Sequence, residues 1–310
     1  MDTTLRARLL GAGPPLRELA PTQIRPALPA ALTAALRLTR AERDRLVIFD
    51  PTVAPLICPL SDAQDLALWH VGAAGRWLIA VPASRAADLP ARHPHLARYL
   101  ATLPAPPAAA PTQPWWVLPA DWERPPEAPR IIVSGALVAW DETTGPVGGS
   151  ATVIAAADPY WLALLASAVG RALLAAGLAV EDMPIPDAPG PARANLAGLA
   201  LSAATLAARR DELERAVTRR LVADFGPPGI QPGPRLRRWW ELSFDELHAA
   251  VNEELHNDIP ERYRPTWAEI HADERATHAD ASARLADLER AIDAQVAALF
   301  EVEPGDLTRK

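Results

Sequence analysis

Residues 150–174, SATVIAAADPYWLALLASAVGRALL, contain the point at which the chain changes from strand to helix. The first seven residues include adjacent β-branched side chains, which are typical of a strand. Asp158 and Pro159 follow, and these residue types suit the N-cap and the first turn of a helix. Apolar residues then recur at helical spacing, at Leu162, Leu165, Val169 and Leu173. The sequence therefore predicts a strand before Asp158 and a buried helix after it.

From about residue 45 to residue 155 the chain consists of short apolar segments separated by Pro and Gly, a pattern that predicts a mostly antiparallel or mixed sheet. We expect residues 104–129, which are rich in Pro, to form an extended loop around one strand. We expect GPVGG, residues 145–149, to form a hairpin turn. The predicted strands are RLVIF (45–49), GRWLIAVP (75–82), WWVLP (115–119), PRIIVSG (129–135), ALVAW (136–140) and SATVIAA (150–156).

The chain after residue 190 has the periodicity of long helices. Helices are predicted over 193–223 and 266–300, and GPPGIQPGP, residues 226–234, must end the first of them. Between them, Ser243 and Glu246 have the spacing of a capping box. The first and last helices are expected to pair antiparallel. The predicted fold class is thus α+β, with a sheet domain over 1–190 and a coiled-coil-like helical region over 191–310.

Composition removes several classes of function. Lys310 is the only lysine, so sites that need a Walker lysine, a Schiff-base lysine or a PD-(D/E)xK lysine are not expected. Cys58 is the only cysteine, which rules out an internal disulfide and favours a reducing cytoplasmic setting. No stretch offers the roughly 18 unbroken apolar residues of a membrane span, so no membrane association is expected.

The charge of the chain is unevenly distributed. The formal net charge is -7, which is not typical of a nucleic-acid-binding protein. Residues 191–238, however, carry nine basic against four acidic side chains, whereas residues 239–310 carry seven against 17. A basic segment is therefore followed by an acidic one.

Several segments together resemble a known family. They occur in the order GRWLIAVP, PWWVLP, APRIIVSG, ADPYWLALLASAVGRALL and MPIPDAP, followed by WWELSFDELHAAVNEELHNDIPERYRPTWAEI and LERAIDAQVAALFEVEPGDL. In this order they resemble the target-recognition domain and the helical end of TaqI-like and type IIG adenine-specific DNA methyltransferases. The resemblance spans roughly residues 20–308.

The resemblance implies a reader of duplex DNA without chemistry of its own. The methyltransferase half of the family has no counterpart, and Asp158-Pro159-Tyr160-Trp161 lacks the second proline of its catalytic Asn-Pro-Pro-aromatic loop. We expect a non-catalytic specificity subunit of a split type IIG-like restriction-modification or phage-defence system. Residues 191–310 would then serve dimerisation or docking to a separately encoded adenine-specific DNA methyltransferase or nuclease. No catalytic residue, cofactor or metal is predicted, since no histidine pair brings a third ligand.

An alternative keeps the fold but not the DNA reading. The Gly-Arg pair of the family is replaced by Ala63-Gln64, and a basic loop before MPIP is shortened to GLAVED, residues 177–182. Both changes remove positive charge or backbone donors from the expected DNA side. The alternative is a degenerate recognition domain that serves as a protein-interaction or structural subunit of a defence complex.

The candidate DNA-binding residues lie in the resembling segments and in RLRRWW, the densest basic and aromatic cluster. Arginine can contact phosphate or guanine, and tryptophan can stack on bases. Equally, the arginines could pair with the acidic helices while the two tryptophans anchor the helical tail on the sheet domain. The candidates are Arg76, Arg130, Arg171, Arg235, Arg237, Arg238, Trp239 and Trp240.

Overall fold

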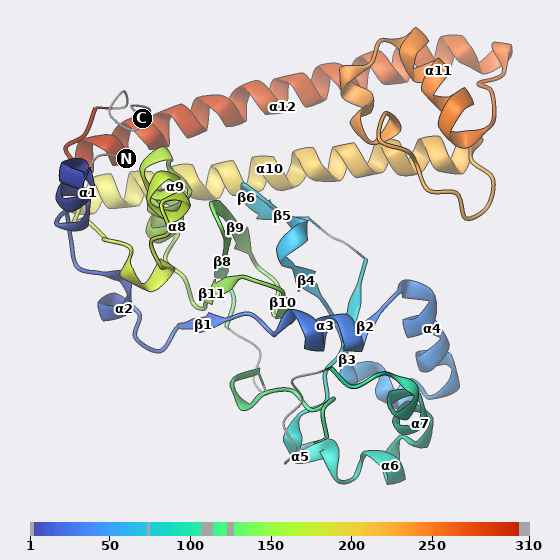
Figure 1. Ribbon diagram of the computed structural model, residues 1–310. Coiled ribbons are helices and arrows are strands. Elements are labelled where there is room, and N and C mark those ends of the chain that lie inside the picture. Colours follow the sequence, from blue (N-terminus) through green and yellow to red (C-terminus); the bar gives the residue numbers. More distant parts are fainter. Residues whose placement is uncertain (1–2, 73–74, 107–113, 123–126, 304–310) are drawn as a thin grey trace. The chain divides into compact units, whose positions relative to one another are not determined.

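The computed structural model describes residues 3–72, 75–106, 114–122 and 127–303. Within it the chain forms two compact units, one of Met1–Ala200 with Ile292–Lys310 and one of Leu201–Ala291. The first unit holds the sheets and the second is helical, so the α+β prediction is confirmed (Figure 1). Much of the predicted Pro-rich loop lies outside the described residues. The functional division at residue 190 stays a prediction.

The main sheet of the first unit has the strand order β1-β11-β8-β9-β6-β5. All of its neighbours are antiparallel except β6 and β9, which are parallel, so the mixed sheet was predicted correctly. Its strands are β1 (Ile24–Pro26), β5 (Leu66–Ala67), β6 (Trp69–Val71), β8 (Arg130–Ser134), β9 (Leu137–Asp141) and β11 (Thr152–Ile154).

Two smaller sheets complete the strand structure of the described residues. They are β2 (Arg37–Leu38), β7 (Trp77–Ile79) and β3 (Ile57–Pro59) in one, and β10 (Val147–Gly148) with β4 (Ser61–Asp62) in the other. The hairpin turn predicted at 145–149 is wrong, because β10 pairs in parallel with the distant β4. Close packing explains these glycines, since a Cβ on Gly148 would lie 2.7 Å from the Thr33 side chain. Residues 115–119 contribute only an isolated bridge between Val117 and Val81.

A group of short helices surrounds β2, β7 and β3. The strand predicted at 45–49 is wrong, because these residues form the end of helix α4. The reason lies just upstream, where Thr39 and Glu42 form a capping box that fixes the helix start. These helices and 3-10 turns are α3 (Ala30–Leu36), α4 (Arg40–Phe49), η1 (Pro51–Leu56), η2 (Ala63–Asp65), α5 (Ala83–Ala86), α6 (Leu89–Arg92), α7 (Pro94–Thr102) and η3 (Ala120–Trp122).

The helix predicted after Asp158 exists, but it is divided in two. The Asp158 carboxylate accepts from the Tyr160 amide at 2.8 Å, as expected of an N-cap. Ser167 ends α8 (Pro159–Ala166) and caps α9 (Ala168–Ala175) by accepting from the Gly170 amide at 3.1 Å. α8 packs against β9, and all of its residues from Tyr160 to Ala166 are buried. Elsewhere in this unit lie α1 (Thr3–Leu10), α2 (Leu16–Leu19) and η4 (Val180–Asp182).

Two long helices, α10 (Gly190–Phe225) and α12 (Arg264–Leu299), run antiparallel and pass through both units (Figure 1). In the first unit Asn195 donates to Gln295 at 2.9 Å, and in the second His278 donates to Glu214 at 2.9 Å. The antiparallel pair was therefore predicted correctly. The second unit adds η5 (Leu236–Glu241), α11 (Phe244–Leu255) and η6 (Glu261–Tyr263).

Each unit has a hydrophobic core. One core of the first unit fills the space around β7 and α7, with Leu78, Ile79 and Leu96 fully buried. The core of the second unit gathers side chains from α10, η5, α11 and α12, including Leu221 and Trp239. The described helices contain no stretch long and apolar enough to span a membrane.

Candidate functional site

The segment Arg235–Trp240 forms the centre of the second unit. The Pro- and Gly-rich residues 226–234 end α10 and lead into η5. Trp239 of η5 packs in one core with residues of both long helices. The Trp239 side chain is fully buried, and its Nε1 donates to the Glu214 carbonyl at 3.2 Å. Its ring centre lies 6.0 Å from that of His271 and 6.1 Å from that of His278. Trp239 thus fixes η5 to both long helices.

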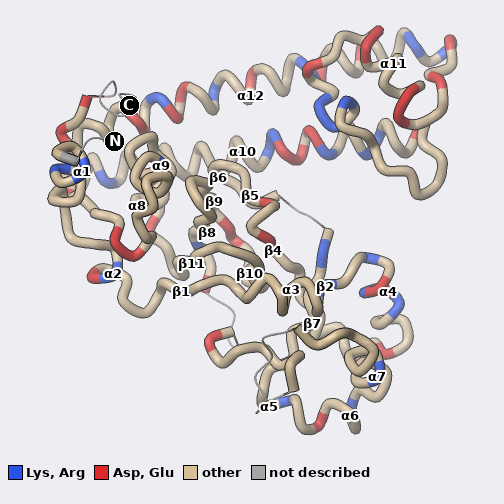
Figure 2. The backbone as a smooth tube through the Cα atoms, in the orientation of Figure 1, with Lys and Arg blue, Asp and Glu red and all other residues tan. Residues whose placement is uncertain are grey.

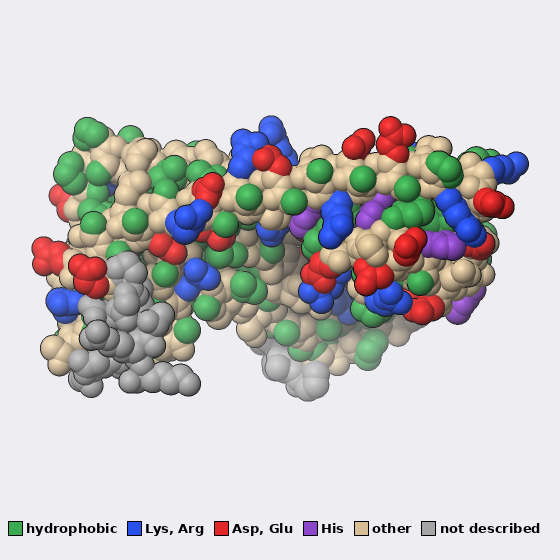
Figure 3. All heavy atoms as spheres, turned by 90° about the horizontal axis from the view of Figure 1, so that it is seen from above, with side chains coloured by type: hydrophobic (Ala, Val, Ile, Leu, Met, Phe, Trp, Pro, Cys, Tyr) green, Lys and Arg blue, Asp and Glu red, His purple; other side chains and the backbone are tan. Residues whose placement is uncertain are grey.

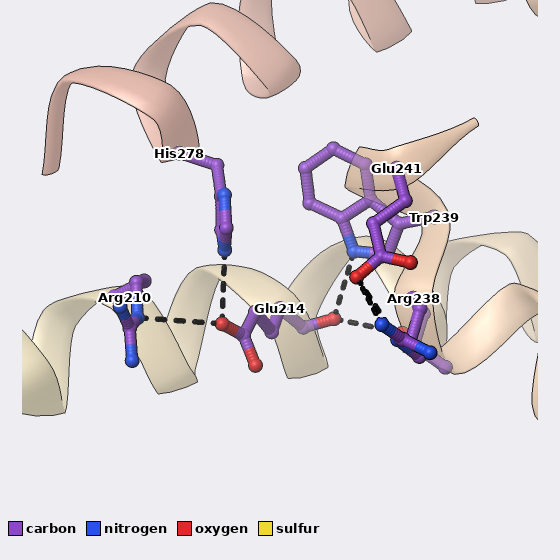
Figure 4. A network of polar contacts seen from close by, with 7 residues as sticks. Arg210, Glu214, Arg238, Trp239, Glu241 and His278 are labelled. Atoms are coloured by element: carbon purple, nitrogen blue, oxygen red, sulfur yellow. Dashed lines mark hydrogen bonds and ion pairs between the residues drawn. The ribbon is translucent and has the colours of Figure 1, made fainter. Parts of the chain in front are cut away.

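Trp240 continues this arrangement towards the surface. Its ring stacks on His278 with 4.6 Å between centroids and 20° between planes. His278 Nε2 in turn donates to Glu214 Oε1, which also lies 3.5 Å from Arg210 Nε (Figure 4). We call Trp239, Trp240, His278 and Glu214 the tryptophan anchor. The expectation that the two tryptophans hold the tail on the sheet domain is corrected, since these contacts lie within residues 201–291.

The arginines of the same segment mostly contact carboxylates of their own unit. Arg235 Nη1 lies 2.5 Å from Glu253, and its backbone amide donates to Glu254 at 2.9 Å. Arg238 donates to Glu241 through Nε at 3.0 Å and through Nη2 at 2.5 Å. Arg237 is exposed and has no ion pair among the described residues. On the visible face of the helical unit, basic and acidic side chains accordingly lie next to one another (Figure 3).

Arg130, a candidate in the first unit, has no exposed surface. Its Nε and Nη2 donate to Asp141 at 3.0 and 2.7 Å, and Nη2 also reaches the Thr143 hydroxyl at 3.2 Å. The pair joins the adjacent strands β8 and β9, where Arg130 and Asp141 are in register. Arg130 is fully buried and so presents no surface to a ligand, and its position is explained by the fold.

The other two candidates of the first unit are partly accessible. Arg76 forms an ion pair with Asp65, whose pKa is raised by burial although Arg76 acts in the opposite direction. Arg171 lies half-buried on α9, and its Nε has no hydrogen-bond partner among the described residues. Of the six candidate arginines, Arg171 and Arg237 therefore remain without a carboxylate partner in the described structure.

The candidates are divided between the two units. Arg76, Arg130 and Arg171 belong to the first unit, whereas residues 235–240 belong to the second. Trp239 is buried, and one face of Trp240 is covered by His278. Their predicted DNA contacts stay a prediction.

A groove between α10 and α12 was missed in the sequence. It has a volume of about 650 Å³, and its described lining residues all come from these two helices. Leu201 is 36% exposed at one end, and Leu206 and Leu288 are half-buried in it. An apolar residue at helical spacing, such as Leu206, does not show by itself whether it packs inside the pair or lines a groove. The residues of this α10–α12 groove are Leu201, Ser202, Thr205, Leu206, Arg209, Arg284, Asp287 and Leu288.

A second hollow, of about 770 Å³, lies in the first unit beside Cys58, Trp122 and Glu142. Burial raises the pKa of the Cys58 thiol, so the nucleophilic thiolate is disfavoured. The described residues contain no group of three or more His, Cys, Asp or Glu side chains that could hold a metal ion. The hollow therefore lacks an activated nucleophile at Cys58.

Comparison with known proteins gives limited matches. Residues 190–296, from the start of α10 to near the end of α12, match a domain of unknown function (DUF8810). No curated protein matches the chain. Among solved structures, the type IIL restriction-modification enzyme MmeI in complex with DNA is similar at 10% identity with a TM-score of 0.42. The alignment covers 82% of this chain and 36% of the MmeI chain.

Proposed function

We propose that the protein is a non-catalytic interaction subunit that docks a partner protein through the α10–α12 groove. The observation that carries the proposal is a groove whose described lining residues all come from α10 and α12. Leu201, Leu206 and Leu288 supply apolar surface in it. An amphipathic helix laid into such a groove buries its apolar face, which is a common mode of recognition.

The charges at the rim indicate what kind of helix fits. Arg209 is exposed and has no ion pair among the described residues. Among the described residues Arg284 forms an ion pair only with Asp280, at 3.5 Å. Both side chains are about two-thirds exposed, so this pair contributes little to stability. Asp287 is already paired with Arg290. A partner helix with an apolar face flanked by acidic residues would therefore be complementary.

The class of partner follows from the family resemblance. TaqI-like and type IIG enzymes join a recognition domain to a methyltransferase, and the segments quoted above resemble only the recognition part and the helical end. We propose that the partner is a separately encoded methyltransferase or nuclease, and that the pair acts in restriction-modification or phage defence.

Co-expression with the products of the neighbouring genes tests the docking proposal. The expected result is a stable heteromeric complex in size-exclusion chromatography with light scattering. Replacing Leu206 with Glu places an unpaired charge in the groove and should abolish the complex. Leu137→Glu, at a 41% exposed apolar position on β9, is the matched control and should leave it intact. A homodimer in place of the complex, or a complex insensitive to Leu206→Glu, would contradict the proposal.

DNA recognition is the second candidate, favoured by the two candidate arginines without carboxylate partners. Arg171 and Arg237 keep guanidinium groups available for phosphate or guanine. A specificity subunit should select one short duplex sequence from a random library in an electrophoretic shift assay, alone or with its partner. Arg171→Gln or Arg237→Gln should weaken this binding, and featureless binding in both settings would exclude DNA reading.

A further inference from the structure

The helices α4 and α7 expose apolar and basic side chains that the fold does not use. α4 has no fully buried residue; Leu46 and Val47 face the core, while Ile48 is 77% and Phe49 68% exposed. Such exposure of two adjacent large apolar residues is costly in water unless something covers them. Leu46 and Val47 therefore attach the helix to the core, and this packing does not account for the apolar side chains at Ile48 and Phe49.

The neighbouring helix α7 extends the same surface. Its buried residues Leu96 and Leu100 face the core, and His95 and Arg98 are exposed. The ring of His95 stacks on that of Phe49, with 6.2 Å between centroids and 23° between planes. This contact joins the outer sides of α4 and α7 into one continuous surface.

Basic groups frame the stacked rings. Arg45 precedes Ile48 and Phe49 by one helical turn, so these three residues share a side of α4. It also lies near enough to α7 to act on the phenol of Tyr99. Arg98 lies one turn after His95 on α7. Figure 2 shows basic positions on both helices. We call Arg45, Ile48, Phe49, His95 and Arg98 the α4–α7 face.

The nearby carboxylates are occupied by other groups. Glu42 accepts from the Thr39 amide and hydroxyl, and the Asp44 carboxylate lies 2.8 Å from Arg43. Asp50 accepts from the Thr52 amide and lies 3.2 Å from His93 Nδ1. Arg45 and Arg98 have no hydrogen bond or ion pair with any described residue. The face therefore combines exposed ring surface with two arginines that form no ion pair in the described structure, although Arg45 is close enough to help lower the pKa of Glu42.

We propose that the α4–α7 face binds single-stranded nucleic acid. Arginines would contact successive phosphates, and Phe49 with His95 would offer ring faces on which unpaired bases stack. The strong exposure of Ile48 and Phe49 means that they project from the surface, whereas a groove that receives an amphipathic peptide is concave. Two projecting apolar residues also provide much less apolar area than the long face of a membrane-surface helix.

Fluorescence anisotropy of the full-length protein with a labelled oligothymidine of about 20 nucleotides tests the proposal. Binding is expected at about 50 mM salt and should weaken steeply by about 200 mM. Phe49→Ala should reduce the affinity about tenfold, the loss of one stacked base. Arg45→Gln and Arg98→Gln should each lower the slope of log affinity against log salt by about 0.7. All three residues are exposed, so the variants should fold, which circular dichroism checks.

Matched controls come from other exposed positions. Leu137→Ala on β9 and Arg290→Gln on α12 remove similar groups away from this face and should leave the affinity and the salt slope unchanged. A duplex of the same length should bind more weakly than the single strand, because its bases are not free to stack on the rings.

Four results would overturn the proposal. They are no binding at the lower salt, an affinity unaffected by Phe49→Ala, equal competition by polyglutamate, and Phe49-dependent binding to phosphatidylserine vesicles without binding to the oligonucleotide. Polyglutamate competition would show a site for any polyanion, and vesicle binding would show a membrane-surface site. Because the α4–α7 face lies in the first unit and the α10–α12 groove in the second, this result is independent of the docking proposal.

Discussion

Replacing Trp239 with alanine should strongly destabilise the second unit while leaving the first intact. The side chain is fully buried among α10, η5 and α12, and truncating a buried tryptophan costs about 3–5 kcal/mol. The lost hydrogen bond to the Glu214 carbonyl contributes about 1 kcal/mol to this cost. Since whole domains are stable by only about 5–15 kcal/mol, the second unit should become marginally stable.

Limited trypsin digestion with mass spectrometry locates the effect. In Trp239→Ala, cleavage should appear after arginines within residues 201–291 under conditions in which the wild-type protein resists, and the sheet strands should stay protected. Trp240→Ala is the matched control; its ring is partly exposed and stacked on His278, so we expect a loss of only about 1–2 kcal/mol. Equal effects of the two substitutions, or cleavage that begins in the sheet unit, would refute the role of Trp239 as the centre of a separate core.

Three further predictions concern buried groups. Asp141→Asn should lower the free energy of unfolding by about 3–5 kcal/mol in urea titrations, because it leaves Arg130 buried without its counter-ion; a double substitution by apolar residues should cost less. Burial lowers the pKa of His271 below its ordinary value of 6.5, so the unfolded chain binds more protons between the lowered pKa and 6.5. Stability should therefore fall as pH falls through that window, with a flatter profile in His271→Gln. Burial raises the pKa of Tyr160 to about 12, so its phenolate absorbance should appear only near that pH. Because the tyrosine of the unfolded chain ionises first, the stability of the fold should decrease as pH rises from about 10 to about 12. A titration of Tyr160 near pH 10 would contradict its burial.

Local signals in the sequence predicted the elements whose structure depends on local interactions. The Asp158 cap and the Ser243–Glu246 capping box formed as expected, because each is decided within a few residues. The antiparallel pairing of α10 and α12 also followed from periodicity over many turns. At residues 45–49 two local signals compete, because the apolar run is typical of a strand whereas the Thr39–Glu42 capping box upstream fixes a helix start.

The functional surfaces could not be found in this way. Whether an arginine is free depends on carboxylates far away in the sequence, as Arg235 with Glu253 and Glu254 shows. The groove at Leu206 depends on how α10 and α12 pack along their length, and an apolar residue at helical spacing gives no indication of that. Likewise, the exposure of Phe49 depends on which side of α4 meets the core.

Hydrogen–deuterium exchange on the complex with the co-expressed partner tests the docking function most directly. We predict that partner binding slows exchange in residues 201–209 of α10 and 284–288 of α12, the two segments that line the groove. Leu206→Glu should remove this protection, whereas Leu137→Glu should preserve it. Protection confined to other parts of the chain, with unchanged exchange in both groove segments, would contradict docking through the α10–α12 groove.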